Sequence, residues 1–284
     1  MSFSGGLAVI VKRILNRKQT VMLSAPFDSL WSEDEAFDKV QTLIGTEFRN
    51  VSGRRTFRIE VDNAGFFVKT HQGVGWREIL KNLMTGKIPV IGAGAEFRAS
   101  RHLKEVGIPA LTITAFGAKG LSPAKTESFL ITEEIAPAVD LEVVTKDWAT
   151  VAPSFRFKLS LIGAVARLIR DMHEAGVNHR DCYLCHFLLH SGSREGTIKL
   201  SVIDLHRAQI RDLVSERWII KDLAALAFSA QDIGLTKRDW LRFLMMYFEC
   251  DASSLIYGRM VELERIRRRL KKFVRRKAKY GELL

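Results

Sequence analysis

Alternating apolar and polar residues mark the first half of the chain. Phe57, Ile59 and Val61 alternate with polar residues, and a period of two is typical of a strand with one buried face. The residues at 62–65 (Asp-Asn-Ala-Gly) favour a tight turn. Apolar residues then resume, so the pattern predicts a β-hairpin over 56–70.

Three further elements are expected in this half. A helical pattern ends at Gly107, a residue type that commonly terminates helices. Two short apolar stretches after it are typical of strands. The predicted helix and the two predicted strands cover 95–106, 111–116 and 128–132.

The second half of the chain has a helical pattern instead. Apolar residues recur every three or four positions over 155–175, and Gly176 follows them, as in an amphipathic helix with a glycine cap. Two short strands are expected at 187–190 and 198–203. The remaining helices are predicted at 217–230, 236–249 and 255–280.

A sheet-rich half precedes a helix-rich half without a Pro- or Gly-rich linker between them, which predicts an α+β fold of two lobes. We expect a small sheet-rich N-terminal lobe and a larger helical C-terminal lobe. With 284 residues, 47% of them hydrophobic, the chain is long enough to bury a sizeable core. Its composition excludes wholesale disorder.

Positive charge is concentrated towards the two ends of the chain. The sequence has 44 Lys and Arg against 32 Asp and Glu, a net charge of +12. Residues 1–20 contribute four basic residues, and 259–280 contribute eleven basic and two acidic ones. The body from 21 to 258 is neutral, with 29 residues of each sign. Because a domain that grips nucleic acid normally carries a basic patch on its own fold, we expect no nucleic-acid partner.

The sequence shows no segment of the kind that crosses a membrane. Its longest apolar runs are far shorter than the about 20 residues of a spanning helix. The basic residues near the N-terminus follow the apolar run 7–11, whereas in a signal peptide they precede it. Three cysteines make no disulfide framework. We therefore expect a cytoplasmic protein.

The most informative stretch for chemistry begins at His179-Arg180-Asp181, after a long predicted helix and before a strand. Asp204 ends the next apolar strand. This order resembles the protein-kinase-like superfamily. Phosphoryl transfer from ATP needs one carboxylate to orient and deprotonate the attacking hydroxyl, and a second to hold Mg²⁺ against the phosphates. By position, Asp181 is the candidate for the first role and Asp204 for the second.

The upstream half supplies the other parts of such a site. Lys69 lies on the second strand of the hairpin, where a kinase has the lysine that contacts the nucleotide phosphates. Glu96 lies on the following helix, where the carboxylate partner of that lysine belongs. Residues 131–134, which include Glu133, would form the hinge whose backbone meets the adenine.

Two local features depart from the protein-kinase pattern. His186 occupies the position five residues after Asp181, where the pattern has Asn. An imidazole is a softer ligand than a carboxamide oxygen, so the manner in which a second Mg²⁺ is held stays open. The expected phosphate loop has Gly53 followed by Arg54 and Arg55 in place of a glycine-rich motif, and these two basic side chains are candidates to hold phosphates.

The third departure concerns the acceptor. Only 18 positions separate Asp204 from Asp222, and no A-P-E motif follows. A protein kinase needs a longer activation segment to bind a polypeptide. The short segment therefore favours a small or sugar-like acceptor.

A closer resemblance is carried by the string H-R-D-C-Y-L-C-H-F at 179–187, which is similar to the signature of the lipopolysaccharide core heptose(I) kinase family. The stretches 201–209 and 217–223 agree with it, and the resemblance runs from about residue 22 to the C-terminus. It implies transfer of the ATP γ-phosphate to a hydroxyl of the first heptose of the lipopolysaccharide inner core. It also implies a peripheral location at the cytoplasmic face of the inner membrane, an association with acyl carrier protein, and an Asp222 that braces the H-R-D loop.

The resemblance and the charge pattern together predict four segments. A basic N-terminal extension covers 1–21. A nucleotide-binding lobe covers 22–136. A lobe with the catalytic loop and the acceptor site covers 137–258, and a basic amphipathic helix covers 259–284.

Two other functions are compatible with the residues. One is a kinase of the same fold that acts on Kdo, another core heptose or tyrosine hydroxyls. The other is a membrane-associated pseudokinase scaffold, against which the joint presence of Lys69, Asp181 and Asp204 argues.

The cysteine-rich part of the loop allows three interpretations. Cys182, Cys185 and His186 fit the C-x-x-C-H pattern of haem attachment, which requires an exported protein. With His190 they could instead form a zinc site, although no second ligand cluster is visible. We favour the third interpretation, in which both cysteines pack beneath the loop as small apolar groups.

The C-terminal segment also allows more than one interpretation. Apolar residues at 263, 266, 270 and 273 have helical spacing and basic residues surround them. The helix could pack on the helical lobe with a solvated basic face. It could also attract an anionic membrane surface and the acidic glycolipid, or, less in keeping with its few aromatic residues, nucleic acid.

Overall fold

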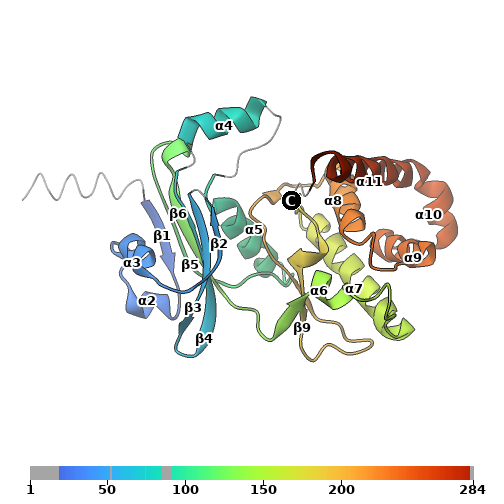
Figure 1. The fold of residues 1–284 in the computed structure, drawn as a ribbon, viewed down its shortest axis with the longest axis horizontal. Coiled ribbons are helices and arrows are strands. Elements are labelled where there is room, and N and C mark those ends of the chain that lie inside the picture. Colours follow the sequence, from blue (N-terminus) through green and yellow to red (C-terminus); the bar gives the residue numbers. More distant parts are fainter. Residues whose placement is uncertain (1–18, 52, 74, 85–90, 282–284) are drawn as a thin grey trace, which may run out of the picture. The chain divides into compact units, whose positions relative to one another are not determined.

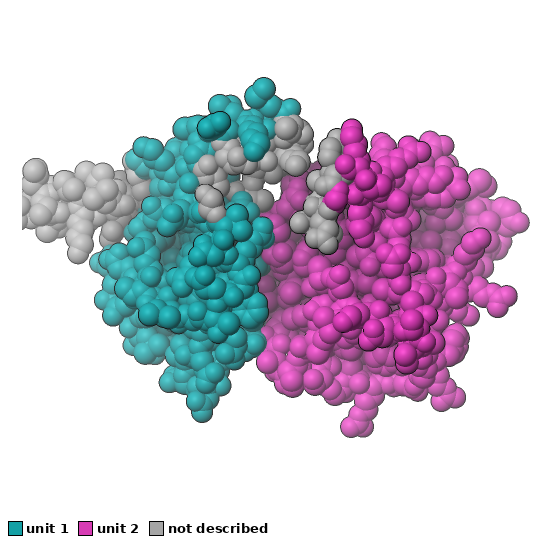
Figure 2. Space-filling view, in the orientation of Figure 1, with its two compact units in different colours: residues 1–98, 112–134 teal, residues 99–111, 135–284 magenta. Residues whose placement is uncertain are grey.

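The computed structural model describes residues 19–281 except 52, 74 and 85–90. The chain divides into two compact units, which Figure 2 shows in teal and magenta. The first comprises the described residues up to Arg98 together with Thr112–Glu134, and the second comprises Ala99–Leu111 and the residues from Ile135 onward.

The first unit is built on a six-stranded antiparallel sheet in the order β1-β5-β6-β4-β3-β2 (Figure 1). The predicted hairpin and the two predicted strands are confirmed as β3–β4, β5 and β6, and β1 and β2 add two strands that the pattern did not predict. The strands are β1 (Gln19–Leu23), β2 (Thr46–Val51), β3 (Arg54–Val61), β4 (Ala64–His71), β5 (Ile113–Lys119) and β6 (Glu127–Glu133).

The hairpin turn has the geometry that its residues favour. Val61 pairs with Ala64, so the loop has two residues, Asp62 and Asn63. Both have positive φ angles, 50° and 62°. Asp and Asn tolerate this left-handed conformation, which matches the twist of the two strands and fixes the register of the hairpin.

The N-terminal edge of the sheet reaches into the predicted extension. Gln19, Thr20 and Val21 pair with β5 at residues 117–119. The basic residues of that extension, at positions 12, 13, 17 and 18, lie outside the described residues.

One face of the sheet packs against two short helices, α2 (Phe27–Leu30) and α3 (Ala36–Thr42). Phe57 and Ile59 point into this core, as the predicted alternation requires. The ring of Phe27 lies edge-on to that of Phe66, with centroids 5.2 Å apart. The core fixes β3 and β4, and therefore fixes the strand that carries Lys69.

The next two helices follow the hairpin. Helix α4 spans Gly75–Met84, and α5 spans Gly94–Glu105, close to the predicted 95–106. Helix α5 begins in the first unit and ends in the second. Ala99 and Leu103, on its later turns, lie in the core of the second unit.

The second unit is mainly helical, and its core surrounds the long helix α7 (Phe155–Glu174). The Ser154 hydroxyl accepts a hydrogen bond from the Phe157 N–H at the start of α7, and Gly176 with φ 78° follows its end. This agrees with the predicted helix and cap. The other helices are α6 (Leu141–Thr145), α8 (Glu216–Ser229), α9 (Lys237–Phe248), α10 (Ala252–Gly258) and α11 (Met260–Tyr280).

The prediction of one helix over 255–280 is wrong, because α10 and α11 are separate. Arg259 lies between them with φ −120° and ψ 20°, outside the helical region. Two local signals explain the break: the Asp251 side chain caps an earlier start at Ala252, and Gly258 has a low helix propensity.

Short strands hold the loops between the helices. Strands β7 (Ala138–Asp140), β9 (Phe187–His190) and β10 (Leu200–Val202) form one antiparallel sheet, and β8 (Val177–Asn178) pairs with β11 (Gln209–Ile210). The strand predicted at 198–203 is therefore shorter than expected. These two small sheets bring the loop after β8 and the loop after β10 together.

Candidate active site

The first candidate cluster is an ion pair between the sheet and α5. The Nζ atom of Lys69, on β4, lies 2.7 Å from Oε1 of Glu96. Glu96 lies in the first turn of α5, where the helix dipole favours a carboxylate, and its side chain is fully buried. The structure therefore brings together the lysine and the glutamate that the sequence singled out.

The phosphate-loop candidates lie on the neighbouring strand. Gly53, with φ 77°, precedes β3, and Arg54 opens β3 opposite His71. The guanidinium of Arg55 bonds to Glu47, with 2.6 Å between Nε and Oε1, and covers the Phe57 ring at 4.1 Å. Arg55 is thus held along the sheet by contacts within its own unit.

The hinge candidate lies at the end of β6. Glu133 pairs with Phe66, and its side chain is exposed. Its N–H donates to the Thr112 carbonyl at 2.9 Å. A nucleotide contact by Glu133 would therefore have to use another atom of the residue.

The H-R-D loop that begins at His179, the candidate catalytic loop, is braced from helix α8 by Asp222. This carboxylate is fully buried and accepts the backbone N–H of His179 at 2.7 Å and that of Arg180 at 2.8 Å. Arg180 adopts the left-handed region with φ 72°, a conformation that costs a non-glycine residue free energy. The role implied for Asp222 is confirmed: its two charge-assisted bonds stabilise the loop in this shape.

The ring of His179 ties the catalytic loop to the loop that carries Asp204. Its Nε2 donates to the Ile203 carbonyl at 3.1 Å, and the ring stacks on that of His186 with centroids 5.2 Å apart. Burial, together with the nearby His186, lowers the pKa of His179 to about 4. The ring is therefore neutral near pH 7 and acts as a structural link.

Asp181 is paired with Arg207, a residue to which the sequence assigned no role. One guanidinium nitrogen, Nη1, lies 2.8 Å from Oδ1 and 3.0 Å from Oδ2 of the carboxylate. A carboxylate has about four acceptor sites, and the shared Nη1 uses those on its inner side. Each oxygen thus retains an acceptor site that a substrate hydroxyl could use.

Asp204 lies between two histidine rings. Its Oδ1 accepts a hydrogen bond from Nδ1 of His206 at 2.9 Å, and its Oδ2 lies 3.5 Å from Nε2 of His186. The Nδ1 of His186 is 2.6 Å from the Asp181 carbonyl and must donate to it. In its neutral form, His186 therefore presents the Nε2 lone pair to Oδ2 of Asp204.

This donor set fits a magnesium ion that substrate phosphates also coordinate. Mg²⁺ in such enzymes is bound by one or two carboxylates, by phosphate oxygens and by water. In the part of the chain that the structure describes, no three His, Cys, Asp or Glu side chains group to hold a metal by themselves. Asp204 offers a partly exposed carboxylate, and the facing lone pair of His186 is a second, softer donor.

The cysteines belong to the hydrophobic core. Cys182 is fully buried in the core cluster and Cys185 packs against it. Burial raises the pKa of the Cys182 thiol well above its ordinary value and that of Cys185 to about 11. His190 bonds to the Ser201 hydroxyl at 2.8 Å. The favoured interpretation of the cysteines as small apolar groups is confirmed.

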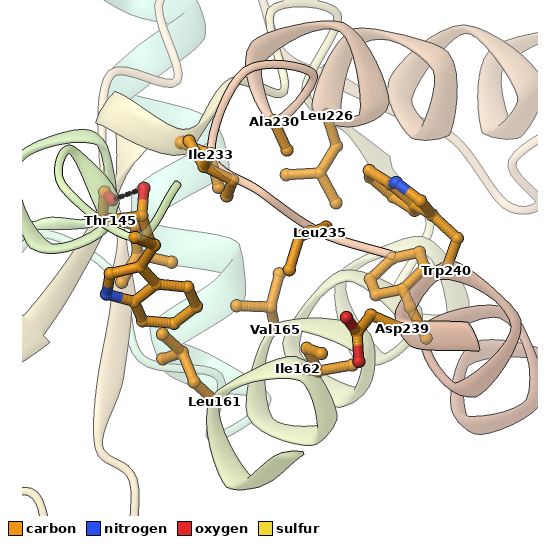
Figure 3. A pocket seen from close by; sticks show the side chains of 14 residues that line it. Thr145, Leu161, Ile162, Val165, Leu226, Ala230, Ile233, Leu235, Asp239 and Trp240 are labelled. Carbon is orange, nitrogen blue, oxygen red and sulfur yellow. Dashed lines mark hydrogen bonds between the residues drawn. The ribbon is translucent and has the colours of Figure 1, made fainter. Parts of the chain in front are cut away.

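The second unit also contains an apolar pocket of about 50 Å³ (Figure 3). Side chains from α6, α7, α8, α9 and the segment between α8 and α9 line it, among them Leu161, Val165, Leu226, Ile233 and Trp240. The carboxylate of Asp239 also lies at the pocket. A lining of this kind favours a hydrocarbon group over a polar ligand.

Helix α11 packs on α8 through its apolar stripe. Ile266 is buried, and the rings of Phe273 and Phe228 have centroids 5.6 Å apart. Arg265 bonds to Glu216 at 2.6 Å. The exposed basic side chains include Arg267, Arg268, Lys271, Lys272, Arg275 and Arg276. None of the helices in the described ranges has both the length and the apolar character needed to span a bilayer.

One unit has a sheet-borne lysine paired with a helix glutamate, and the other has a braced H-R-D loop with Asp181 beside the loop that carries Asp204. These features are those of a phosphotransferase of the protein-kinase-like class. Comparison with known proteins assigns the family. Residues 38–247 match the model of the lipopolysaccharide kinase (Kdo/WaaP) family, and the chain belongs to this family.

Its relatives carry the activity that the sequence resemblance implied. The chain is 50% identical over 266 residues to the lipopolysaccharide core heptose(I) kinase WaaP of Pseudomonas aeruginosa, covering 93% of this chain and 99% of the relative. It is 47% identical over 230 residues to that of Escherichia coli K12, covering 80% and 87%. A solved structure of WaaP in complex with acyl carrier protein has a TM-score of 0.77 and 45% identity, covering 89% of this chain and 98% of that one.

Proposed function

We propose that the protein is an ATP-dependent kinase that phosphorylates the first heptose of the lipopolysaccharide inner core. The carrying observation is the braced catalytic loop, in which Asp222 fixes the backbone on either side of the His179–Arg180 peptide and Arg207 orients Asp181. The heptose acceptor rests on the names of relatives that are about half identical to the chain.

Each of the three main site residues has its own role in the proposed reaction. Lys69, held by Glu96, anchors the phosphates of ATP. Asp204 would hold Mg²⁺, and a bound Mg²⁺ would supply charge neutralisation at the phosphates. Asp181 accepts a hydrogen bond from the sugar hydroxyl and takes its proton as the phosphoryl group is transferred. Most of the acceleration comes from positioning and electrostatic stabilisation.

The first test replaces Asp181 by Asn, which keeps its shape and removes its charge and basicity. We expect Asp181→Asn to lower kcat by about 10²–10⁴, with ATP binding nearly unchanged. Transfer of labelled phosphate from ATP to a defined core glycolipid, and separately to a protein acceptor, measures both activity and acceptor class.

The control is Asp232→Asn, an exposed aspartate of the same unit, which should behave as the unchanged protein. Phosphorylation of protein but not of the glycolipid would contradict the sugar acceptor, and an active Asp181→Asn variant would remove Asp181 from its role.

We further propose that the exposed face of α11 binds the anionic inner surface of the membrane. Its basic side chains point away from the stripe that packs on α8, and each basic group near such a surface contributes about 1 kcal/mol. The quadruple change of Lys271, Lys272, Arg275 and Arg276 to Gln should weaken sedimentation with anionic vesicles, while activity on a short soluble acceptor is kept. Equal sedimentation of both proteins would contradict the proposal.

An association with acyl carrier protein is proposed from the related complex. The pocket of the second unit, about 50 Å³ in volume, has an apolar lining that suits the terminal carbons of an acyl chain. Mixing the protein with acylated and unacylated carrier protein, followed by size-exclusion chromatography, tests both points. We expect a complex that forms preferentially with the acylated form.

A further inference from the structure

A group of cations surrounds one tryptophan beside the catalytic loop. Trp218 lies in the first turn of α8, and four basic groups lie 5.3–5.7 Å from the centroid of its ring. We call this the Trp218 cluster, and its cations are Arg180, Arg211, Arg217 and Lys221.

The cluster is directly connected to Asp181. Arg180 precedes Asp181 in the chain, and the Nζ atom of Lys221 donates to the Arg180 carbonyl. Strand pairing of β11 with β8 places Arg211 next to the start of the same loop, where its N–H donates to the Gly176 carbonyl at 2.9 Å. The cations therefore come from three segments: the H-R-D loop itself, the residue that follows β11, and helix α8.

Within the described residues these cations have no carboxylate as a direct ion-pair partner, although the charges of Asp181 and Asp222 act on Arg180 and Lys221. The Asp181 carboxylate is bonded to Arg207 instead, and the Asp222 carboxylate accepts backbone N–H groups. The indole ring offsets only part of the repulsion, since one cation–π contact contributes about 0.5–2 kcal/mol.

Arg180 shows most clearly that a partner is missing. Its side chain is 7% exposed, and its Nε is buried without a hydrogen-bond partner. Burial, and next the charge of Arg207, lowers the pKa of Arg180. Burial also lowers the pKa of Lys221 to about 8, although Asp181 and Asp222 oppose this. A buried donor left unsatisfied costs free energy, and an anion beside this guanidinium would stabilise its charge.

From this geometry we infer that the Trp218 cluster is an anion subsite for the acceptor. It binds a carboxylate or phosphate group on a sugar next to the one that is phosphorylated, and so presents the reacting hydroxyl to Asp181. Planar guanidinium groups suit both anions because they can donate two parallel hydrogen bonds. The inference rests on the proposed function, since it assumes a sugar acceptor.

The test varies the acceptor and the cluster together. Three synthetic heptosyl acceptors are compared: one with a carboxylate on the neighbouring sugar, one with that carboxyl reduced to an alcohol, and one with a phosphate monoester in its place. Arg211→Gln and Arg217→Gln are the variants, because both side chains are exposed and their loss leaves the core intact. Arg238→Gln, an exposed arginine on α9, is the control.

We expect each cluster variant to raise KM for an anionic acceptor about tenfold, with the KM for ATP and the KM for the reduced acceptor unchanged. A rise with the carboxylate or with the phosphate acceptor supports the subsite and identifies its ligand. An equal rise for the reduced acceptor, a rise in the KM for ATP instead, or no rise with either anionic acceptor would overturn the inference. If the unchanged protein phosphorylates none of the three acceptors, the proposed function fails instead.

Discussion

Asp222 holds the backbone of the H-R-D loop in its observed shape. Asp222 lies on α8, and its carboxylate accepts hydrogen bonds from the backbone N–H groups of His179 and Arg180. The Nε2 atom of His173 lies 3.4 Å from Oδ2 of Asp222. Arg180 keeps its left-handed backbone because these bonds offset its conformational cost. The single carboxylate therefore couples the stability of the unit to the position of Asp181.

Replacing Asp222 by Asn tests this coupling. An amide of the same shape turns a charged acceptor into a neutral group with one accepting oxygen, so the two N–H groups can no longer both be satisfied. Bonds to a charged group contribute about 1.5–3 kcal/mol each, and we expect a loss of about 3 kcal/mol in the free energy of unfolding, measured by urea titration. Asp212→Asn, at an exposed aspartate of the same unit, should cost less than about 0.5 kcal/mol; equal losses would contradict the bracing role.

Helix α9 begins with a capping box that also joins it to α7. The Thr236 hydroxyl accepts the Asp239 N–H, and the Asp239 carboxylate accepts the Thr236 N–H. Lys158 of α7 bonds to the same carboxylate at 3.1 Å. Burial by itself would raise the pKa of Asp239, but the bonds to Thr236 and Lys158 lower it to about 2.

This pKa predicts a dependence of stability on pH. The folded pKa lies below the ordinary value of 3.8, so the contribution of Asp239 is complete above about pH 4 and is lost as the pH falls towards 2. The difference corresponds to about 2 kcal/mol. Urea titrations of the unchanged protein and Asp239→Asn should therefore differ at pH 7 and converge near pH 2; a constant difference would argue against the ion pair and cap.

At the scale of the whole molecule, each unit has its own hydrophobic core. The core of the first unit lies between the sheet and two short helices, and that of the second surrounds α7 and α8. Helix α11 belongs to the second core, because Ile266, Leu270 and Phe273 contact it. The basic helix is thus a structural element as well as a candidate membrane surface.

Removing residues 260–284 should therefore destabilise the second unit. The deletion uncovers apolar side chains of α8, and the loss of three large contacts at about 1.5–3 kcal/mol each makes a lowered Tm the expected result. The quadruple Gln variant of α11 retains those contacts and should keep its Tm. A deletion variant with an unchanged Tm would show that α11 contributes no packing, and only then would deletion be a clean test of membrane binding.

Local pattern predicted the elements that need few distant contacts. The β3–β4 hairpin follows from alternation and from the turn residues Asp62 and Asn63, and α7 follows from its apolar stripe between Ser154 and Gly176. In contrast, β2 is exposed along its whole length and gave no alternating signal. The break at Arg259 depends on two weak local preferences, the cap at Asp251 and the low helix propensity of Gly258. The helical spacing of the apolar and charged residues around it was the stronger signal, so the sequence predicted one continuous helix.

The order of the chemical groups follows from the amino-acid sequence alone: a strand lysine, a helix glutamate, the H-R-D loop and an aspartate after the next strand. The structure keeps this order because the spacing of motifs along the chain does not depend on how the chain folds. Which of these groups lie in contact depends instead on how the chain packs. Arg207 reaches Asp181 across 26 positions, and four cations converge on Trp218. Such contacts depend on how β8, β11 and α8 pack together, and no local spacing encodes that packing.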